Sequence, residues 1–206
     1  MQGLLLKDWY MIKKYCRAYL LLTVIFTVVS FFGEDNLFLI FYPCFLCGVI
    51  PVNLIAYDES SRWTQYSEAL PYTRALIVSS KYLIGIFTQL AVIILTIVAQ
   101  SIRMNMAGNF SLSELLMIAM SMVSIASLSS SICLPFIFKM GVEKGRTAYY
   151  VMIGIVCAGA ASASMLFGEQ AAAQINLPIA IIAGVSVAIY AFSWYLSILF
   201  YKKREL

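Results

Sequence analysis

The sequence predicts an all-α integral membrane protein in which six transmembrane helices form a single domain over residues 1–206. Hydrophobic residues make up 62% of the chain and charged residues only 12%, which is more apolar surface than a soluble domain of this size buries. The alternating strands of a membrane barrel are not seen. Six apolar runs reach or approach the roughly 20 residues that a helix needs to cross the hydrocarbon core. They lie at about 18–33, 37–57, 74–102, 112–138, 149–168 and 177–201.

The basic residues predict the orientation of these spans. All 14 lysines and arginines except Arg103 precede span one or follow spans two, four and six. By the positive-inside rule, both termini and the loop after span two are therefore cytoplasmic. Orientation and anionic lipid headgroups account for the net charge of +4, so no nucleic-acid partner is expected.

Residues 1–17, ahead of span one, are predicted to form a helix that lies in the cytoplasmic interface and meets span one at an elbow. Apolar residues recur on one helical face at spacings of four, three and four, and the lysines lie largely off that face. The residues of this face are Leu5, Trp9, Ile12 and Cys16. No small-x-small cleavage site follows, so the segment is not expected to be a removed signal peptide.

Prolines and polar residues mark features within the spans. Span two contains Pro43 and Pro51, each of which removes a backbone hydrogen bond, so a bend is predicted there. Spans one and three carry polar stripes. Such residues either pack one helix against another or line a passage or a seam between subunits, and the sequence leaves both open. The residues concerned are Thr23, Thr27, Gln89, Thr96 and Gln100.

The loop after span two is the one long water-compatible passage of the chain and runs over residues 57–82. Asp58 is a suitable N-cap, Glu59 complements the helix dipole in the first turn, and Pro71 blocks continuation. These signals predict a helix of about ten residues within 58–71, followed by a third span for which Thr73 is a suitable N-cap.

The helix predicted within this loop is amphipathic. Trp63, Tyr66 and Leu70 fall on one side of it, and the opposite side carries Ser61, Thr64, Gln65 and Glu68. This pattern is typical of a helix that another protein binds and moves. It is equally typical of a membrane-surface helix that only anchors two spans.

The chemistry that the sequence lacks restricts its function. The absence of histidine removes histidine-ligated metal sites and a Ser–His catalytic pair. The ten acidic residues fall in loops or at span ends, which argues against ion-coupled transport through buried acids. Cys44 and Cys47 suit a packed helix better than metal or redox chemistry, and no nucleotide-binding loop is present. We therefore expect no catalytic, cofactor-binding or metal-binding residues, and an energy source on another chain.

Short motifs along the chain resemble those of small ABC-2-type transporter permeases. They are Gly3-Leu-Leu-Leu-Lys-Asp8, Tyr57-Asp58-Glu59, Leu70-Pro71, Thr73-Arg74 and Ser80-Lys81-Tyr82. The layout of cytoplasmic termini, six spans and a large loop after span two is also similar. The resemblance implies a protein of the bacterial cytoplasmic membrane that pairs with a second permease subunit, identical or related. It also implies cytosolic ATPase subunits, which use the ATP and Mg.

The resemblance implies a role for the loop as well. In this family the helix after span two is the coupling helix, which seats in a groove on the ATPase. Carried over by position, the coupling helix lies within 58–71. Its expected contact residues are Asp58, Glu59, Arg62, Trp63, Tyr66 and Glu68, with Leu70 and Pro71 as the bend toward span three.

The sequence thus gives a leading hypothesis and two alternatives. The first is the permease subunit of an ATP-driven exporter of amphipathic peptide or lipid-like cargo, similar to exporters of phenol-soluble modulins or bacteriocin-type peptides. The second is the substrate-binding membrane subunit of an energy-coupling-factor vitamin importer, against which the loop helix argues. The third is a membrane scaffold or regulator with no transport role.

Overall fold

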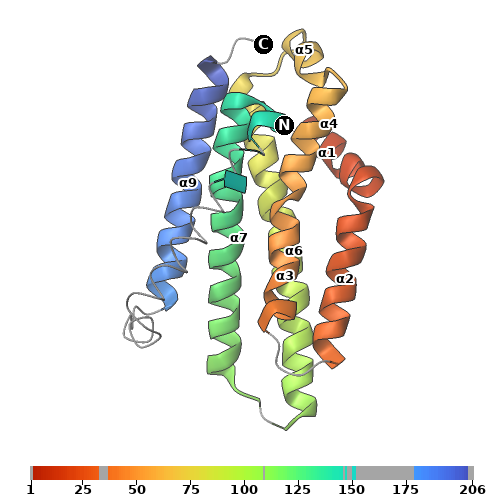
Figure 1. Ribbon diagram of the computed structural model, residues 1–206, viewed down its shortest axis with the longest axis vertical. Coiled ribbons are helices and arrows are strands. Elements are labelled where there is room, and N and C mark those ends of the chain that lie inside the picture. Colours follow the sequence, from red (N-terminus) through yellow and green to blue (C-terminus); the bar gives the residue numbers. More distant parts are fainter. Residues whose placement is uncertain are drawn as a thin grey trace.

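The apolar runs of the sequence form long helices that lie side by side in the computed structural model (Figure 1). The structure describes residues 2–32, 37–108, 110–145, 147, 150–151 and 179–203, and this part of the chain contains helices and no strand. The helices are α1 Gln2–Tyr15, α2 Arg17–Phe32, α3 Leu37–Gly48, α4 Ile50–Ser60, α5 Trp63–Glu68, α6 Arg74–Met106, α7 Leu112–Met140 and α9 Ile179–Lys203.

Among the described residues, four stretches are long and apolar enough to cross a membrane, so the chain is a multi-pass membrane protein. These are Leu39–Ser60, Arg74–Met106, Leu112–Met140 and Ile179–Lys203. They correspond to the predicted spans two, three, four and six. The predicted span one is helical, although its apolar stretch, Arg17–Ser30, is shorter. Apart from residues 150 and 151, the predicted span at 149–168 lies outside the described residues, so the count of six spans stays a prediction.

Span two, in which two prolines predict a bend, is divided into α3 and α4. α3 contains Pro43 and ends at Gly48, and α4 begins at Ile50 with Pro51 in its first turn. Proline has no N–H to continue the helical ladder, which explains a break at this point. Gly48 also packs closely on α7, since a Cβ atom there would lie 2.9 Å from the Ser129 hydroxyl oxygen.

The buried apolar side chains form two groups inside the bundle. One surrounds Val78, Tyr82 and Leu134, where α4, α6, α7 and α9 meet. The other surrounds Leu54 and Met122, where α1, α3, α4, α6 and α7 meet. In contrast, the outer faces of α2, α6 and α9 expose large apolar side chains, as lipid-facing helices do. Examples are Leu21, Ile25, Val28, Phe87, Ile94, Val98, Ile181, Val185 and Phe192.

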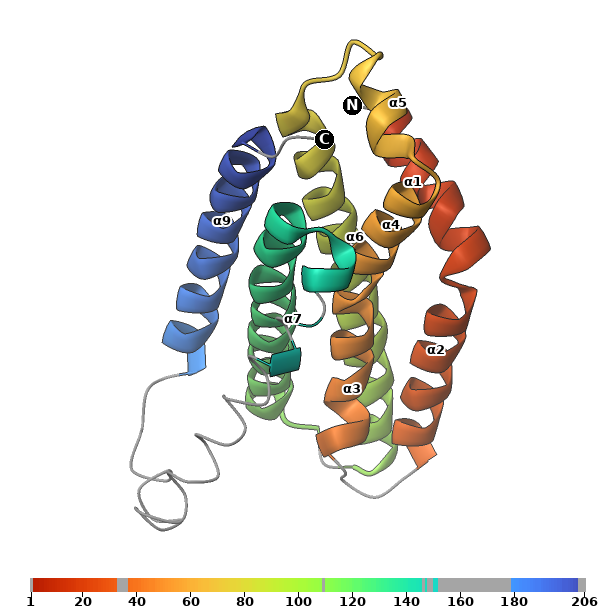
Figure 2. The ribbon, with the colours of Figure 1, turned by 45° about the horizontal axis from the view of Figure 1, so that its top comes forward.

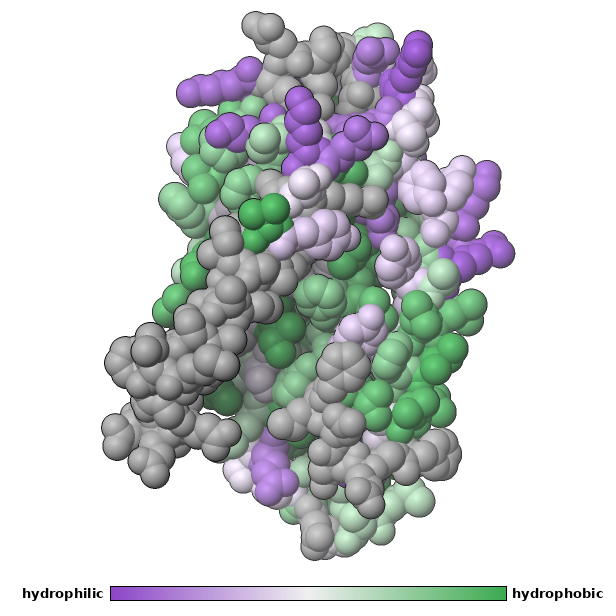
Figure 3. Space-filling view, in the orientation of Figure 1, coloured by the Kyte–Doolittle hydropathy of each residue, from purple (hydrophilic) through white to green (hydrophobic). Residues whose placement is uncertain are grey.

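The polar end of the molecule carries α5. Figures 1 and 2 place the start of α1, the junction of α4 and α5, the start of α6 and the last turn of α9 at this same end. Figure 3 shows hydrophilic side chains gathered mainly there, above a predominantly hydrophobic middle. The predicted cytoplasmic elements therefore lie together, as the positive-inside rule requires. That this end faces the cytoplasm stays a prediction.

Candidate functional site

The loop after span two begins later than predicted. α4 does not stop at Tyr57 but continues through Asp58 and Glu59 to Ser60, so Asp58 is not an N-cap. The hydroxyl of Ser60 donates to the Tyr57 carbonyl oxygen at 3.0 Å. Hydroxyls that bond back to the preceding turn are common where a helix ends. The prediction failed because Asp58 finds partners on distant helices in place of a local backbone N–H.

The separate helix of this loop, α5, is shorter than the predicted ten residues. It comprises the six residues Trp63–Glu68. The residue before it, Arg62, has a φ of 54°, the left-handed conformation that turns the chain sharply between α4 and α5. After α5 the chain turns through Leu70 and Pro71, and the Thr73 hydroxyl accepts a hydrogen bond from the Leu76 N–H at 3.3 Å. Thr73 is therefore the N-cap of α6, as predicted.

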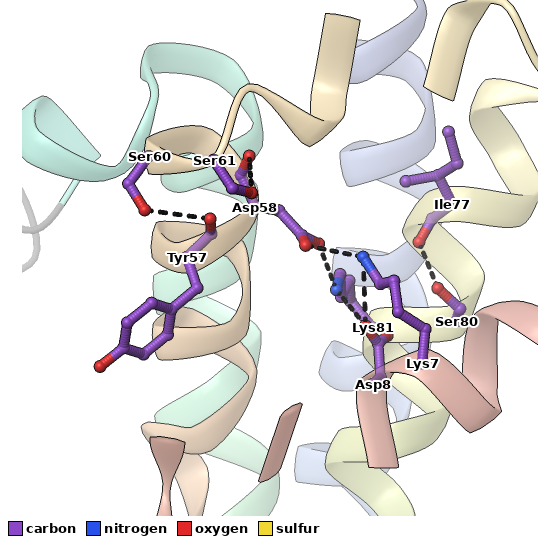
Figure 4. Close-up of polar contacts among 9 residues, drawn as sticks. All are labelled: Lys7, Asp8, Tyr57, Asp58, Ser60, Ser61, Ile77, Ser80 and Lys81. Carbon is purple, nitrogen blue, oxygen red and sulfur yellow. Dashed lines mark hydrogen bonds and ion pairs between the residues drawn. The ribbon is translucent and has the colours of Figure 1, made fainter. Parts of the chain in front are cut away.

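Below α5 lies a group of four charged residues, two lysines and two aspartates, contributed by α1, α4 and α6 (Figure 4). The Lys81 ammonium lies 2.7 Å from Asp8 Oδ1 and 2.6 Å from Asp58 Oδ2. The Lys7 ammonium lies 2.6 Å from Asp58 Oδ1 and 3.7 Å from Asp8 Oδ1. We call these four residues the ion cluster.

Three of the four residues of the ion cluster are held away from water, whereas Lys7 is partly exposed. Asp8 is 0% exposed, Lys81 3% and Asp58 4%. Buried charges persist only when they are paired, and removing one partner of such a pair typically costs about 3–5 kcal/mol. The two positive and two negative charges balance, so each charge on the three helices has an oppositely charged partner. Among the described residues, Asp8 Oδ2 has no hydrogen-bond partner, which leaves the opposing lysines as its compensation.

Lys7 connects the ion cluster to α5. Its ammonium lies 4.2 Å from the centroid of the Trp63 ring, within the range of a cation–π contact. Burial lowers the pKa of Lys7, the nearby Lys81 adds to this effect, and the carboxylates of Asp58 and Asp8 oppose it. Lys7 thus contacts the last turn of α4 and the first residue of α5 at once.

The aromatic side chains of α5 divide between the core and the surface. The rings of Trp63 and Tyr66 lie 5.4 Å apart, on one side of the helix as predicted. Trp63 packs inward against the buried apolar residues, whereas Tyr66 is 59% exposed. Arg62 and Gln65 are also exposed, and Leu70 is partly buried. The side chain of Glu68 lies outside the described part of the structure.

Two further contacts tie neighbouring segments to this end. The Glu59 carboxylate accepts a hydrogen bond from the Val142 N–H at 2.9 Å, which connects α4 to the chain after α7. The Arg74 guanidinium donates to the carbonyl oxygens of Tyr201 and Lys202 at 3.4 and 3.3 Å. A cation at a helix C-terminus satisfies carbonyls that the helix leaves free. The predicted contact residue Glu59 is therefore used inside the chain.

Sequence reasoning placed Asp58 in the site but did not include Lys7, Asp8 and Lys81. Two signals pointed to them. Asp8 lies midway between Leu4 and Ile12, at spacings of four, so an acidic residue stands on the buried stripe of α1. Lys81 follows a run of apolar and small residues near the start of α6. A charged residue at an interior position of a helix needs an opposite charge nearby.

The polar residues predicted in the spans are all buried and hydrogen-bonded within the chain. The Gln89 amide donates to the Ala126 carbonyl oxygen at 3.0 Å and to the Ser130 hydroxyl at 2.7 Å, joining α6 to α7. The Gln100 amide donates to the Ser30 hydroxyl at 2.9 Å, joining α6 to α2. The three threonines bond back to their own helices, and they are Thr23, Thr27 and Thr96. The two glutamines therefore join neighbouring helices, and a role of any of these residues in a passage or a subunit seam stays a prediction.

Comparison with protein families identifies a match over nearly the whole chain. The matching family model, described as ABC-2 family transporter protein, covers residues 3–202. This range includes the ion cluster, α5 and the long apolar helices. No match was found among curated proteins or solved structures.

Proposed function

The chain belongs to the ABC-2 family of transporter proteins and is a membrane permease subunit of an ABC transporter with an ATPase partner, and we propose that it exports amphipathic peptide or lipid-like cargo from a bacterial cell. As a transport subunit of this family it needs no catalytic residues of its own. The family match also favours this hypothesis over a subunit of a vitamin importer and over a scaffold.

We propose that α5 and its flanking residues, within 58–71, form the contact with the ATPase. The observation that carries this proposal is that the two aromatic side chains of α5 have different surroundings. Trp63 packs inward onto Lys7 and the core, while Tyr66 is left 59% exposed at the polar end of the bundle. Exposed aromatic residues often dominate interfaces, and this one stands on a helix supported from below by the ion cluster.

A second permease subunit, identical or related, completes the transporter in this proposal. The polar residues of spans one and three are engaged inside the chain, so they support a passage between two subunits better than a passage through one. For example, Gln89 and Gln100 are 6% and 4% exposed. The exposed apolar faces of α2, α6 and α9 provide the surfaces against which lipid and the second subunit pack.

The cargo class rests on the apolar character of the chain. A cavity of about 300 Å³ between α7 and α9 is lined mainly by apolar side chains such as Ile132, Phe136 and Phe192. Surfaces of this kind suit amphipathic or lipid-like molecules better than ions or sugars, whose polar groups need hydrogen-bond partners when they leave water. The scarcity of acidic residues in the spans supports the same conclusion.

The ATPase contact is tested by Tyr66→Ala. We expect this change to weaken copurification of the ATPase from native membranes by about 2 kcal/mol of association free energy, because an exposed aromatic at an interface centre contributes that much. Tyr10→Ala is the matched control, since Tyr10 is a comparably exposed tyrosine on α1.

The fold of each variant is checked by its melting temperature. Equal copurification of the ATPase with both variants and with the wild type would count against the contact. Trp63→Ala is a weaker probe, because Trp63 also packs against the core and against Lys7. It is expected to lower both association and stability.

A further inference from the structure

We propose that the ion cluster joins α1 to α4 and α5 as one moving part, and that Lys7 and Asp8 are the positioning residues that carry movement of α5 into span one. This inference rests on the proposed function, since it requires an ATPase that moves α5. It goes beyond that function by assigning a path for the movement through the N-terminal helix.

The ion cluster lies where movement of α5 would first enter the bundle. Asp58 is in the last turn of α4, and Trp63 is the first residue of α5. Lys7 touches both, with its ammonium 2.6 Å from Asp58 Oδ1 and 4.2 Å from the centroid of the Trp63 ring. A displacement of α5 therefore acts directly on α1.

The chemistry of the cluster resists sliding of α1 along α4. A shift by one helical turn, about 5.4 Å, would break the 2.6 Å ion pair between Lys7 of α1 and Asp58 of α4, and it would carry Asp8 away from Lys81 of α6, now 2.7 Å distant. The contact continues along α1, where the rings of Tyr15 and Tyr57 stack with centroids 4.3 Å apart. We infer that α1 follows α4 and α5 as a unit.

α1 passes this movement on to span one. A single residue, Cys16, separates α1 from α2, and it is 0% exposed. The hydrogen bonds continue through this junction, since Cys16 N–H donates to the Ile12 carbonyl oxygen and Leu20 N–H donates to that of Cys16, at 3.0 and 3.2 Å. A hydrogen-bonded, buried junction is a stiff elbow, so α2 turns when α1 turns.

α6 provides the fixed side of this arrangement. Lys81 faces the ion cluster, whereas the next residue, Tyr82, faces α9. The Tyr82 hydroxyl lies 2.8 and 2.7 Å from the hydroxyl oxygens of Ser193 and Ser197. α6 is thus anchored to α9 by the residue that follows Lys81. Because Lys81 pairs with both Asp8 and Asp58, we infer that α1 and α4 move together about this shared contact.

The double substitution Lys7→Gln/Asp8→Asn tests the path. It removes one positive and one negative charge, both from α1, and it leaves the neutral pair of Asp58 and Lys81, 2.6 Å apart. The site therefore stays charge-balanced, and α4 remains joined to α6. Lys14→Gln, on the exposed side of α1, is the matched control.

The readout needs no cargo. Spin labels are placed at exposed Gln65 on α5 and at exposed Leu22 on α2, each paired with a reference label at Val185 on α9. The complex with the copurified ATPase is reconstituted in lipid nanodiscs, and label distances are compared without nucleotide and after ADP–vanadate trapping. In the wild type, in the control and in Lys7→Arg, which keeps the charge, we expect both labels to move.

In the double variant we expect Gln65 to move as in the wild type and the displacement of Leu22 to be lost, while ATPase copurification and melting temperature are retained. The inference is overturned alone if Gln65 moves and Leu22 either stays still in the wild type or still moves in the double variant. If no ATPase copurifies with the wild type, or if trapping leaves Gln65 in place, the proposed function fails as well.

Discussion

The ion cluster below α5 and the hydrogen bonds between the spans hold helices together by different means. In the cluster, four charges from α1, α4 and α6, three of them buried, lie within ion-pair distance. In the spans, the contacts are neutral: Gln89 donates to Ala126 and Ser130, and Gln100 donates to Ser30. Strong pairing is thus concentrated at one end, where α5 meets the bundle.

This difference separates rigid from adjustable contacts. Breaking a buried ion pair costs about 3–5 kcal/mol, whereas a hydrogen bond between membrane helices contributes about 0.6 kcal/mol on average. Helices joined only by the second kind can shift relative to one another at small cost. The cluster therefore fixes α1, α4 and α6 relative to one another below α5. The spans that are joined only by neutral hydrogen bonds can shift at the smaller cost that a transport cycle requires.

The largest expected effect comes from Lys81→Met. This change leaves Asp8 and Asp58 buried with only Lys7 to balance them, and we expect the free energy of unfolding to fall by about 3–5 kcal/mol. Unfolding of the purified protein in mixed micelles by increasing SDS measures this loss. Lys203→Met, at the exposed end of α9, is the control. Similar stability of the two variants would contradict a strong cluster.

A smaller effect is expected from Gln89→Leu, which removes two hydrogen bonds between α6 and α7 without burying a charge. The loss should be about 1 kcal/mol, since such bonds rarely exceed 1.7 kcal/mol each in membranes. The same SDS titration measures it. A loss as large as that of Lys81→Met would show that the spans are held as firmly as the cluster.

The architecture follows from the sequence where local signals decide it. Apolar length predicted the long apolar helices, and Thr73 predicted the start of α6. Pro43 and Pro51 predicted a bend in span two, where the structure has a break between α3 and α4. Each of these signals acts within one or two helical turns, because hydropathy, the missing proline N–H and capping are properties of neighbouring residues.

The ion cluster could not be predicted in the same way. Lys7 and Asp58 are separated by 51 positions, and Asp8 and Lys81 by 73. Asp58 is a residue type that often caps the start of a helix, but in the structure it pairs with distant lysines. Tertiary contacts here override the local preference. Reading Asp8 as an acid on the apolar stripe of α1 identifies that a partner is needed, but the sequence does not say which lysine it is.

Gln100→Leu should have a smaller effect than Gln89→Leu, because its amide makes one bond, to the Ser30 hydroxyl, in place of two. We expect a loss of about 0.6 kcal/mol in the same titration. The two amides lie on the same helix, so each serves as a control for the other. An equal or reversed order would mean that the loss does not follow the number of bonds.

The smallest expected effect on stability comes from replacing the whole ion cluster with apolar residues, Lys7→Met/Asp8→Leu/Asp58→Leu/Lys81→Met. Well-packed apolar residues often replace a buried ion network without loss, because desolvation of the charges no longer opposes folding. We expect the free energy of unfolding to equal that of the wild type or to rise.

The same variant separates stability from transmission. Apolar side chains permit α1 to slide along α4, since no ion pair fixes their register. We therefore expect the spin label on α2 to lose its nucleotide-dependent movement although the protein stays folded. A variant that is stable and still moves α2 would show that packing alone transmits the movement. A strongly destabilised variant would show that the charges of the cluster are needed for the fold itself.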